Sequence, residues 1–297
     1  MLLDILVDYC NQTYLRQKKA GQCTFCNHPT CHCPGIDCET CLDQVHFPNK
    51  YTNGRMDYLC PNIPNYYVCK YTHKYSSEIE YALNTIDHLP KLDKFNILSL
   101  GCGASPDLIA IENYVKRNGF NISIDYLGID INDNWKPIHD VIKSYGFTNK
   151  INIGYLYEDV IETYKDHYSD KINIFVMQYL ISHFYNTGKL TMVRDFYKRL
   201  IKNVVSYMPK EAVIIINDVN SCYRGRDLLV IFANMIQQAG INARITQRYF
   251  NYNIRNVHQE YGIVYPNNNV LEWPSSALAN YNPWTVCSSA QLIIELG

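Results

Sequence analysis

The sequence has almost no net charge and no long hydrophobic run. Its formal charge is −1 and 19% of its residues are charged, so neither sign is in excess and the total does not call for a nucleic acid or an anionic membrane as partner, although a local basic face remains compatible with it. Its longest apolar stretches, such as AVIIIN from residue 212, have the length of a β-strand and cannot span a bilayer. We therefore expect no membrane association.

The first ten residues also lack the features of a secretion signal. MLLDILVDYC contains Asp4 and Asp8, and no basic segment precedes its apolar positions. We therefore expect a reducing, cytoplasmic environment. In such a compartment densely spaced cysteines bind metal ions more often than they form disulfides.

Cysteine is concentrated in one short segment, CTFCNHPTCHCPGIDCETC, which spans residues 23–41. Its two C-x-x-C pairs have the spacing of a tetrahedral zinc site, and four thiolates would leave no open position for catalysis. The predicted metal ligands are Cys23, Cys26, Cys31, Cys33, Cys38 and Cys41. Cys60, Cys69 and His46 are further candidates, so one or two zinc ions remain open, and an iron–sulfur cluster is the alternative.

Short apolar runs alternate with helical patterns from residue 95 onward. This alternation predicts a mostly parallel sheet with helices on both faces, a Rossmann-like α/β fold. Five runs of strand length are followed by two more near the C-terminus, which gives seven expected strands, at 95–100, 123–131, 151–157, 171–177, 212–219, 242–250 and 290–296.

Helical patterns and cysteine content predict the domain organisation. We expect an amphipathic helix over residues 2–19, a helix that begins with a capping box at Ser77, and a long helix over residues 188–208. The chain then divides into residues 1–75, a helix with a small zinc-binding module, and residues 76–297, the α/β domain. An insert at about 251–287 separates the last two strands of that domain.

A glycine-rich turn follows the first predicted strand of the α/β domain. Gly101 and Gly103 in LSLGCGASPDL let the backbone turn tightly and approach a ligand at the start of a helix. A dinucleotide fingerprint needs a third small residue where this chain has Pro106, so a nicotinamide cofactor is disfavoured. Asp130 lies at the end of the second strand, where a carboxylate can accept hydrogen bonds from ribose hydroxyls.

Further candidate residues follow the third and fourth strands. Glu158 and Asp159 come after the third strand, and FVMQYLISHF extends beyond the fourth. The carboxyl ends of parallel strands meet at one edge of a sheet, where such folds bind their ligands. We therefore expect these residues to face the same crevice as the glycine turn.

These motifs resemble those of the class I S-adenosylmethionine-dependent methyltransferases over roughly residues 70–297. That family has a seven-stranded sheet whose last two strands form an antiparallel pair at one edge. The resemblance implies that S-adenosylmethionine is the cofactor. By the same resemblance the cofactor-binding residues are Tyr75, Gly101, Gly103, Asp130, Ile131, Glu158, Asp159 and Gln178, with Tyr179 beside the methyl group.

A general base is the remaining requirement when the methyl acceptor must lose a proton. His183 in QYLISHF is the first candidate and Asp218 in INDVNS the second, and with Tyr179 they form the predicted catalytic set. The stretch MQYL replaces the N-P-P-Y type tetrad of amino-methylating DNA enzymes, which argues against an adenine-N6 DNA methyltransferase.

The sequence therefore predicts a methyltransferase, a transferase with a macromolecular acceptor. The acceptor would be RNA, DNA or protein, contacted with help from the zinc module. One alternative is a small-molecule methyltransferase in which the insert at 251–287 acts as a lid. Another is a non-catalytic interaction protein that keeps the cofactor and zinc sites. The oligomeric state is left open.

Overall fold

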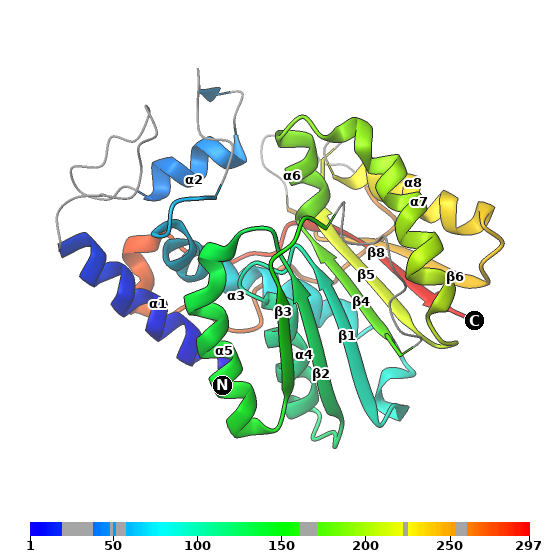
Figure 1. The fold of residues 1–297 in the computed structure, drawn as a ribbon, viewed down its shortest axis with the longest axis horizontal. Helices are drawn as coiled ribbons and strands as arrows, with labels where there is room; N and C mark the ends of the chain where they lie inside the picture. Colours follow the sequence, from blue (N-terminus) through cyan, green and yellow to red (C-terminus); the bar gives the residue numbers. More distant parts are fainter. Residues whose placement is uncertain (20–37, 48–49, 52–57, 161–170, 222–224, 253–259) are drawn as a thin grey trace.

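The computed structural model describes residues 1–19, 38–47, 50–51, 58–160, 171–221, 225–252 and 260–297. These residues form one mixed sheet with the strand order β3-β2-β1-β4-β5-β8-β6-β7 (Figure 1). Its strands are β1 (Lys94–Leu100), β2 (Ser123–Ile129), β3 (Asn152–Leu156), β4 (Ile174–Gln178), β5 (Val213–Val219), β6 (Ala243–Tyr249), β7 (Ile263–Val264) and β8 (Ser289–Leu296).

The sheet is mostly parallel, as the alternation of strands and helices predicts. Strands β1 to β5 pair in parallel, whereas β8 runs antiparallel between β5 and β6. The antiparallel ending implied by the family resemblance is therefore confirmed. The described part of the sheet has eight strands where the sequence predicts seven, because the two-residue strand β7 pairs with the outer end of β6.

Helices cover both faces of the sheet (Figure 1). They are α1 (Leu2–Lys19), α2 (Cys38–His46), α3 (Ile63–Leu83), α4 (Pro106–Arg117), α5 (Lys136–Asn149), α6 (Leu180–Asn186), α7 (Val193–Asn203) and α8 (Arg226–Gln238). Side chains of α1, α3, α4 and α5 share one buried cluster with the sheet, and those of α6, α7 and α8 share the other. The protein has a Rossmann-like α/β fold.

The central strand β5 illustrates how the sequence builds this two-sided core. Its residues alternate between the faces, with Val213 and Ile215 in one cluster and Ile214 and Ile216 in the other. All four are fully buried. A strand covered on both faces is apolar at every position, since each side chain points into one of two helical layers.

The N-terminal helix α1 belongs to the same core as the sheet. Leu6 and Cys10 are fully buried in the cluster that includes α3 and the strands. The Tyr14 ring lies 5.3 Å from that of Tyr66 on α3. The helix predicted over residues 2–19 is thus confirmed. Helix α3 continues through residue 75, so the predicted boundary after residue 75 falls within that helix. The division of the chain into two domains stays a prediction.

Two predicted helix boundaries are wrong. The capping-box pattern at Ser77 lies inside α3, which begins at Ile63 with a proline in its first turn. The Ser77 hydroxyl donates instead to the carbonyl of His73, 2.6 Å away and one turn earlier. The long helix predicted at 188–208 is also wrong in extent, because α7 covers only Val193–Asn203 and short 3-10 turns flank it.

The predicted zinc module is only partly described. Cys23, Cys26, Cys31 and Cys33 lie outside the described residues, whereas Cys38 and Cys41 are buried on the first turn of α2. Among the described residues, His, Cys, Asp and Glu side chains form no group of three or more that could hold a metal ion. The zinc site stays a prediction.

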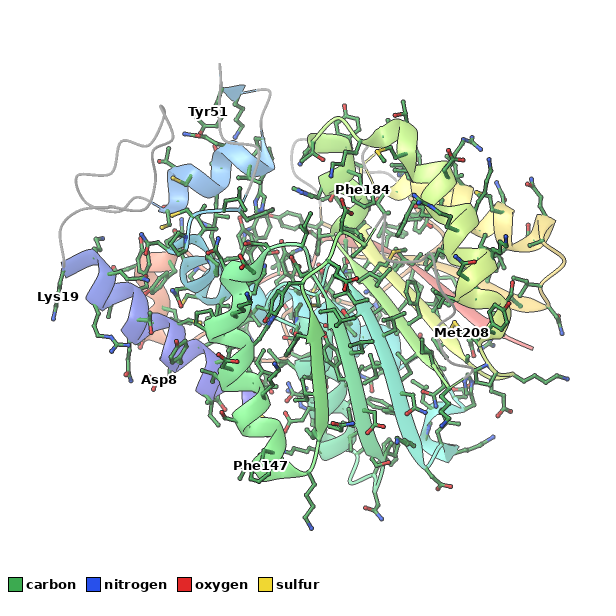
Figure 2. The ribbon with its side chains drawn as sticks, viewed as in Figure 1. Asp8, Lys19, Tyr51, Phe147, Phe184 and Met208 are labelled. Carbon is green, nitrogen blue, oxygen red and sulfur yellow. The ribbon has the colours of Figure 1, made fainter. Side chains whose placement is uncertain are left out.

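The two ends of the sheet differ in what surrounds them. Figure 2 shows Phe184 on α6, at the end of the molecule where the parallel strands have their carboxyl ends, and Phe147 at the opposite end on α5. Phe147 is 90% exposed, whereas Phe184 is buried.

None of the described helices is both long and apolar enough to cross a membrane.

Candidate functional site

A cavity of about 690 Å³ lies at the carboxyl ends of the parallel strands. Its walls come from the turns after β1, β2, β3, β4 and β5, from α2, α3 and α6, and from the segment before β8. The cofactor site predicted from the sequence belongs to the same edge, where ligands of open parallel sheets bind.

The glycine turn forms part of the cavity wall. Gly101 and Gly103 have φ angles of +63° and +49°, which glycine adopts without the cost that a Cβ would add. A Cβ on Gly101 would lie 3.0 Å from Cδ1 of Leu180. The N–H groups of Gly101 and Cys102 donate to the carbonyl of Ile129, at 2.8 and 3.1 Å, so the turn is fixed to the end of β2.

Asp130 fixes the other side of the glycine turn. Its carboxylate accepts hydrogen bonds from the backbone N–H of Gly103 (2.8 Å) and of Asn132 (2.9 Å). Burial raises the pKa of Asp130 to about 6, and these two bonds oppose the rise. Each carboxylate oxygen retains a lone pair after these bonds, so Asp130 can still accept hydrogen bonds from two neighbouring hydroxyls.

His139 on α5 supports the turn from behind, and the sequence analysis missed it. Its Nε2 is 2.7 Å from the Gly103 carbonyl, its Nδ1 is 2.8 Å from the Tyr157 hydroxyl, and its ring stacks on Tyr155 with centroids 3.7 Å apart. Burial lowers the pKa of His139 to about 4, so near neutral pH the ring is neutral. A single His within a helical pattern carries no sequence signal for this contact.

Aromatic rings form a second wall of the cavity. Tyr67, Tyr71 and Tyr75 are spaced four residues apart on α3, which places them on one face of the helix. The rings of Tyr71 and Tyr75 stack with centroids 5.4 Å apart, and Tyr75 lies 4.2 Å from Tyr179. Tyr179 has a φ of +56°, an unusual value for a large side chain. Such rings offer negative faces to a cation.

Glu78 connects the aromatic wall to the sheet, and sequence reasoning missed it as well. The fully buried Glu78 carboxylate accepts from the Tyr179 hydroxyl (2.8 Å), the Asn217 amide (2.9 Å) and the backbone N–H groups of Ser288 and Ser289 (2.9 and 3.2 Å). The ammonium of Lys74, one turn earlier on α3, lies 3.0 Å from it. The contacts of Glu78 therefore connect α3 to the end of β4, to β5 and to the start of β8 around the cavity.

Most of the predicted site residues line this cavity. They are Tyr75, Gly101, Gly103, Asp130, Ile131, Asp159, Gln178, Tyr179 and His183. The carboxylate of Asp159 lies 3.8 Å from the ammonium of Lys189. The structure thus brings together residues from the ends of β1, β2, β3 and β4, as their positions in the sequence predict.

Two predicted residues do not line the cavity. Glu158 is exposed. Asp218 is fully buried, and its carboxylate accepts from the backbone N–H groups of Ile181, Ser182 and Val219, at 2.9, 3.0 and 2.7 Å. Asp218 therefore caps the first turn of α6, and its position gives it no access to a substrate in the cavity.

Two histidines in the cavity differ in their partners. His46, a candidate zinc ligand, has both ring nitrogens within hydrogen-bond distance of tyrosine hydroxyls, 3.1 Å to Tyr71 and 2.9 Å to Tyr58. Burial lowers its pKa to about 4. His183 on α6 lies with its ring 5.5 Å from that of Tyr58, and burial lowers its pKa too. Near neutral pH both imidazoles are therefore neutral.

Known proteins resemble this chain only weakly. No protein-family model and no curated protein sequence matches the chain. Among solved structures, a Listeria monocytogenes protein assigned to the class I S-adenosylmethionine-dependent methyltransferases is 13% identical, with a TM-score of 0.45; the match covers 75% of this chain and 59% of that protein.

Two other solved structures are methyltransferases whose names give different acceptors. The plantazolicin methyltransferase BpumL, solved with S-adenosylhomocysteine, is 12% identical with a TM-score of 0.46, over 87% of this chain and 95% of its own. An rRNA methylase from Streptococcus thermophilus is 9% identical with a TM-score of 0.37, over 72% and 94%. These structural neighbours are methyltransferases with different acceptors, so they leave the acceptor of this chain open.

Proposed function

We propose that the protein is an S-adenosylmethionine-dependent methyltransferase. The observation that carries the proposal is the position of Asp130, which lies at the carboxyl end of β2 and is bonded to the glycine turn that follows β1. A carboxylate in that position can accept hydrogen bonds from both hydroxyls of a ribose. The neighbouring cavity has room for a nucleoside with an amino-acid side chain.

The residues present fit this cofactor. The cofactor would supply a methyl group activated by a positively charged sulfur. The aromatic wall already holds one cation, since the Lys74 ammonium lies 4.8 and 4.6 Å from the ring centroids of Tyr75 and Tyr179. The glycine turn leaves space that a Cβ would fill. Ile131 is 62% exposed at the cavity wall, where it is available to pack on a flat base.

His183 is the proposed general base. Its lowered pKa leaves the imidazole unprotonated near neutral pH, so a ring nitrogen can take a proton from the acceptor. It lines the cavity from α6, next to Tyr58. Asp218, the other base candidate, is engaged by three backbone donors and lies away from the cavity wall.

A macromolecular acceptor fits the surroundings of the cavity. Phe47 and Leu59, which lie just after α2 and just before α3, line the cavity and are 44% and 63% exposed. With Ile131 they present apolar groups to solvent around the site, as is typical of a surface that contacts a partner. We propose that this surface and the adjoining cysteine-rich segment, with bound zinc, receive RNA, DNA or protein.

Binding of S-adenosylhomocysteine tests the cofactor assignment. We expect calorimetry to show binding to the native chain and a loss of tenfold or more in Asp130→Ala. Asp133→Ala is the matched control, since Asp133 is exposed and pairs with Lys136, 3.1 Å away. If the native chain binds no S-adenosylhomocysteine, the proposal is wrong.

Transfer of a labelled methyl group identifies the acceptor. Incubation of the chain with radiolabelled S-adenosylmethionine and a cell extract, followed by nuclease or protease digestion, assigns the label to nucleic acid, protein or small molecules. Elemental analysis of the purified chain tests the zinc site, with Cys23→Ser as the variant expected to lower the zinc content. Label found only in small molecules would contradict the macromolecular acceptor.

A further inference from the structure

Positive charge is concentrated in the segment 189–210. This segment holds six of the chain's 27 lysines and arginines but only one of its 28 acidic residues, Asp195. The net charge of −1 for the whole chain therefore conceals one strongly basic segment. Its basic residues are Lys189, Arg194, Lys198, Arg199, Lys202 and Lys210.

Three of these residues form a row on α7. Arg194, Lys198 and Lys202 follow one another at intervals of four residues and are all exposed, so they lie along one face of the helix. The opposite face is buried, with Phe196 and Leu200 in the core. At a rise of 1.5 Å per residue the row extends over about 12 Å of helix.

The stability of α7 does not explain this row. Like charges four residues apart on a helix repel each other, and Arg194 lies in the first turn, where the helix dipole disfavours a cation. Asp195 pairs with Lys198 at 3.1 Å, but among the described residues no carboxylate pairs with Arg194 or Lys202. A partner that carries negative charge would relieve the repulsion.

The row leads to the cavity. Since β4 and β5 are parallel, α7 between them returns from the carboxyl edge of the sheet to its amino edge. Phe184 and Met208, labelled in Figure 2, precede and follow this helix. Lys189, just before the row, lines the cavity and is 43% exposed, with its ammonium 3.8 Å from the Asp159 carboxylate. A polyanion bound along α7 therefore reaches the mouth of the cavity.

Apolar side chains accompany the basic row. Leu190 and Met192, just before α7, are 37% and 39% exposed, and Tyr207, after it, is 44% exposed. Basic residues with aromatic and apolar side chains among them bind unpaired nucleic acids, because the cations meet the phosphates and the flat bases pack on the rings. Phosphates follow one another about every 3.4 Å along a stacked strand, so the row spans about three or four of them.

We propose that the exposed face of α7 binds the phosphate backbone of an unpaired RNA strand and directs one of its bases to the cavity. This inference rests on the proposed function, in which the RNA carries the methyl acceptor. A paired base must leave its stack to enter an enzyme cavity, a cost that an unpaired base avoids. Unpaired bases are also the usual target of RNA-binding proteins.

Fluorescence anisotropy with a short, labelled, unstructured RNA tests this docking surface. For a single strand, each phosphate contact contributes about −0.7 to the slope of log affinity against log salt concentration. Contacts from Lys189 and from the three cations of the row should give the native chain a slope of about −3. A duplex DNA of the same length should bind at least tenfold more weakly than the RNA.

The triple variant Arg194→Gln/Lys198→Gln/Lys202→Gln should bind the RNA at least tenfold more weakly, with a slope of about −1, because three contacts are lost. It should bind S-adenosylhomocysteine like the native chain, since its changes are on the surface of α7. The matched control is Lys91→Gln/Lys143→Gln/Lys150→Gln. It removes the same charge from three exposed residues outside the row and should bind the RNA within about twofold of the native chain.

Methyl transfer in a cell extract tests the identity of the partner. Label from S-adenosylmethionine should enter material that ribonuclease digests, and the triple variant should transfer at least tenfold less of it. Label in DNA or in protein would contradict an RNA partner.

The outcomes separate this inference from the proposed function. If the native chain binds the RNA but not S-adenosylhomocysteine, the proposed function fails and α7 remains an RNA-binding surface without a role in methyl transfer. The docking surface is wrong, and the cofactor assignment stands, if the chain binds S-adenosylhomocysteine but not the RNA, if duplex DNA binds as tightly as the RNA, or if the triple variant binds the RNA as well as the control variant does.

Discussion

Asp130 should make the proposed cofactor site sensitive to pH. Burial raises its pKa to about 6, so the carboxylate is ionised above that pH and becomes protonated as the pH falls through it. The protonated acid is a poorer acceptor for the Gly103 N–H and for ribose hydroxyls. We therefore expect the affinity for S-adenosylhomocysteine to be highest above pH 7 and to fall below pH 6. Calorimetry from pH 5 to 8 checks this.

The control for this pH dependence is Asp130→Asn, which should bind more weakly but with little change between pH 5.5 and 7. A native affinity that is constant over the same range would contradict the role given to Asp130.

At Asp218 we expect a stability effect without a binding effect. Asp218→Asn keeps one acceptor oxygen where the carboxylate has two, so at least one of the three backbone donors at the start of α6 loses its partner. A buried unsatisfied group costs about 1–3 kcal/mol. Thermal unfolding should show this loss, while the affinity for S-adenosylhomocysteine stays within about threefold. A variant of normal stability with no methyl transfer would instead support a catalytic role for Asp218.

Sequence patterns predict the site residues that directly follow a strand. They miss the residues that only tertiary packing brings to the site. Gly101 and Asp130 were predictable because each directly follows a strand and parallel strands share one edge. Glu78 and Lys74 were not predictable, because they lie on α3, a helix that is separated in the sequence from those strand ends. Glu158 and Asp159 are neighbours in the same turn, and the sequence does not tell which of the two faces the cavity.

At the scale of elements, the glycine turn tolerates a side chain poorly at Gly101. Gly101→Ala would place a Cβ at 3.0 Å from Leu180 in a backbone conformation with φ of +63°. The conformation alone costs about 1–2 kcal/mol, and the contact adds to it by moving the turn. We expect the affinity for S-adenosylhomocysteine to fall by tenfold or more.

Gly119→Ala is the matched control for this prediction. Gly119 has a φ of +66°, but no atom lies within 4 Å of its would-be Cβ. The variant should lose a similar amount of stability in thermal unfolding and bind S-adenosylhomocysteine normally. Equal losses of binding in both variants would show that the effect is not local to the turn.

Strands were more predictable than helix boundaries. The apolar runs of β1 and β5 are bounded by turn residues, and their short length alone distinguishes them from helices. The pattern Ser77-x-x-Glu80 satisfies a capping box, yet the same serine hydroxyl can bond to a carbonyl one turn earlier within a helix. Local sequence does not choose between these two bonds. The choice depends on the packing of α3 between α1 and α4.

At the scale of the whole molecule, α1 should unfold together with the sheet. Leu6 is fully buried in the cluster that joins α1 and α3 to the strands. Leu6→Ala should lower the free energy of unfolding by about 2–5 kcal/mol. Far-ultraviolet circular dichroism and tryptophan fluorescence should report the same midpoint. Two separate transitions would show that the N-terminal helix forms an independent unit.

The partners of Glu78 also determine when the cavity can be completed during synthesis. Two of its donors, the N–H groups of Ser288 and Ser289, come from the start of β8, some 210 positions later in the chain. Strand β8 then enters the sheet between β5 and β6. A nascent chain that has folded α3 and the first five strands still holds a buried carboxylate with part of its donors missing. The ribosome must therefore release the chain through β8, which ends at Leu296, before this edge of the sheet reaches its final form.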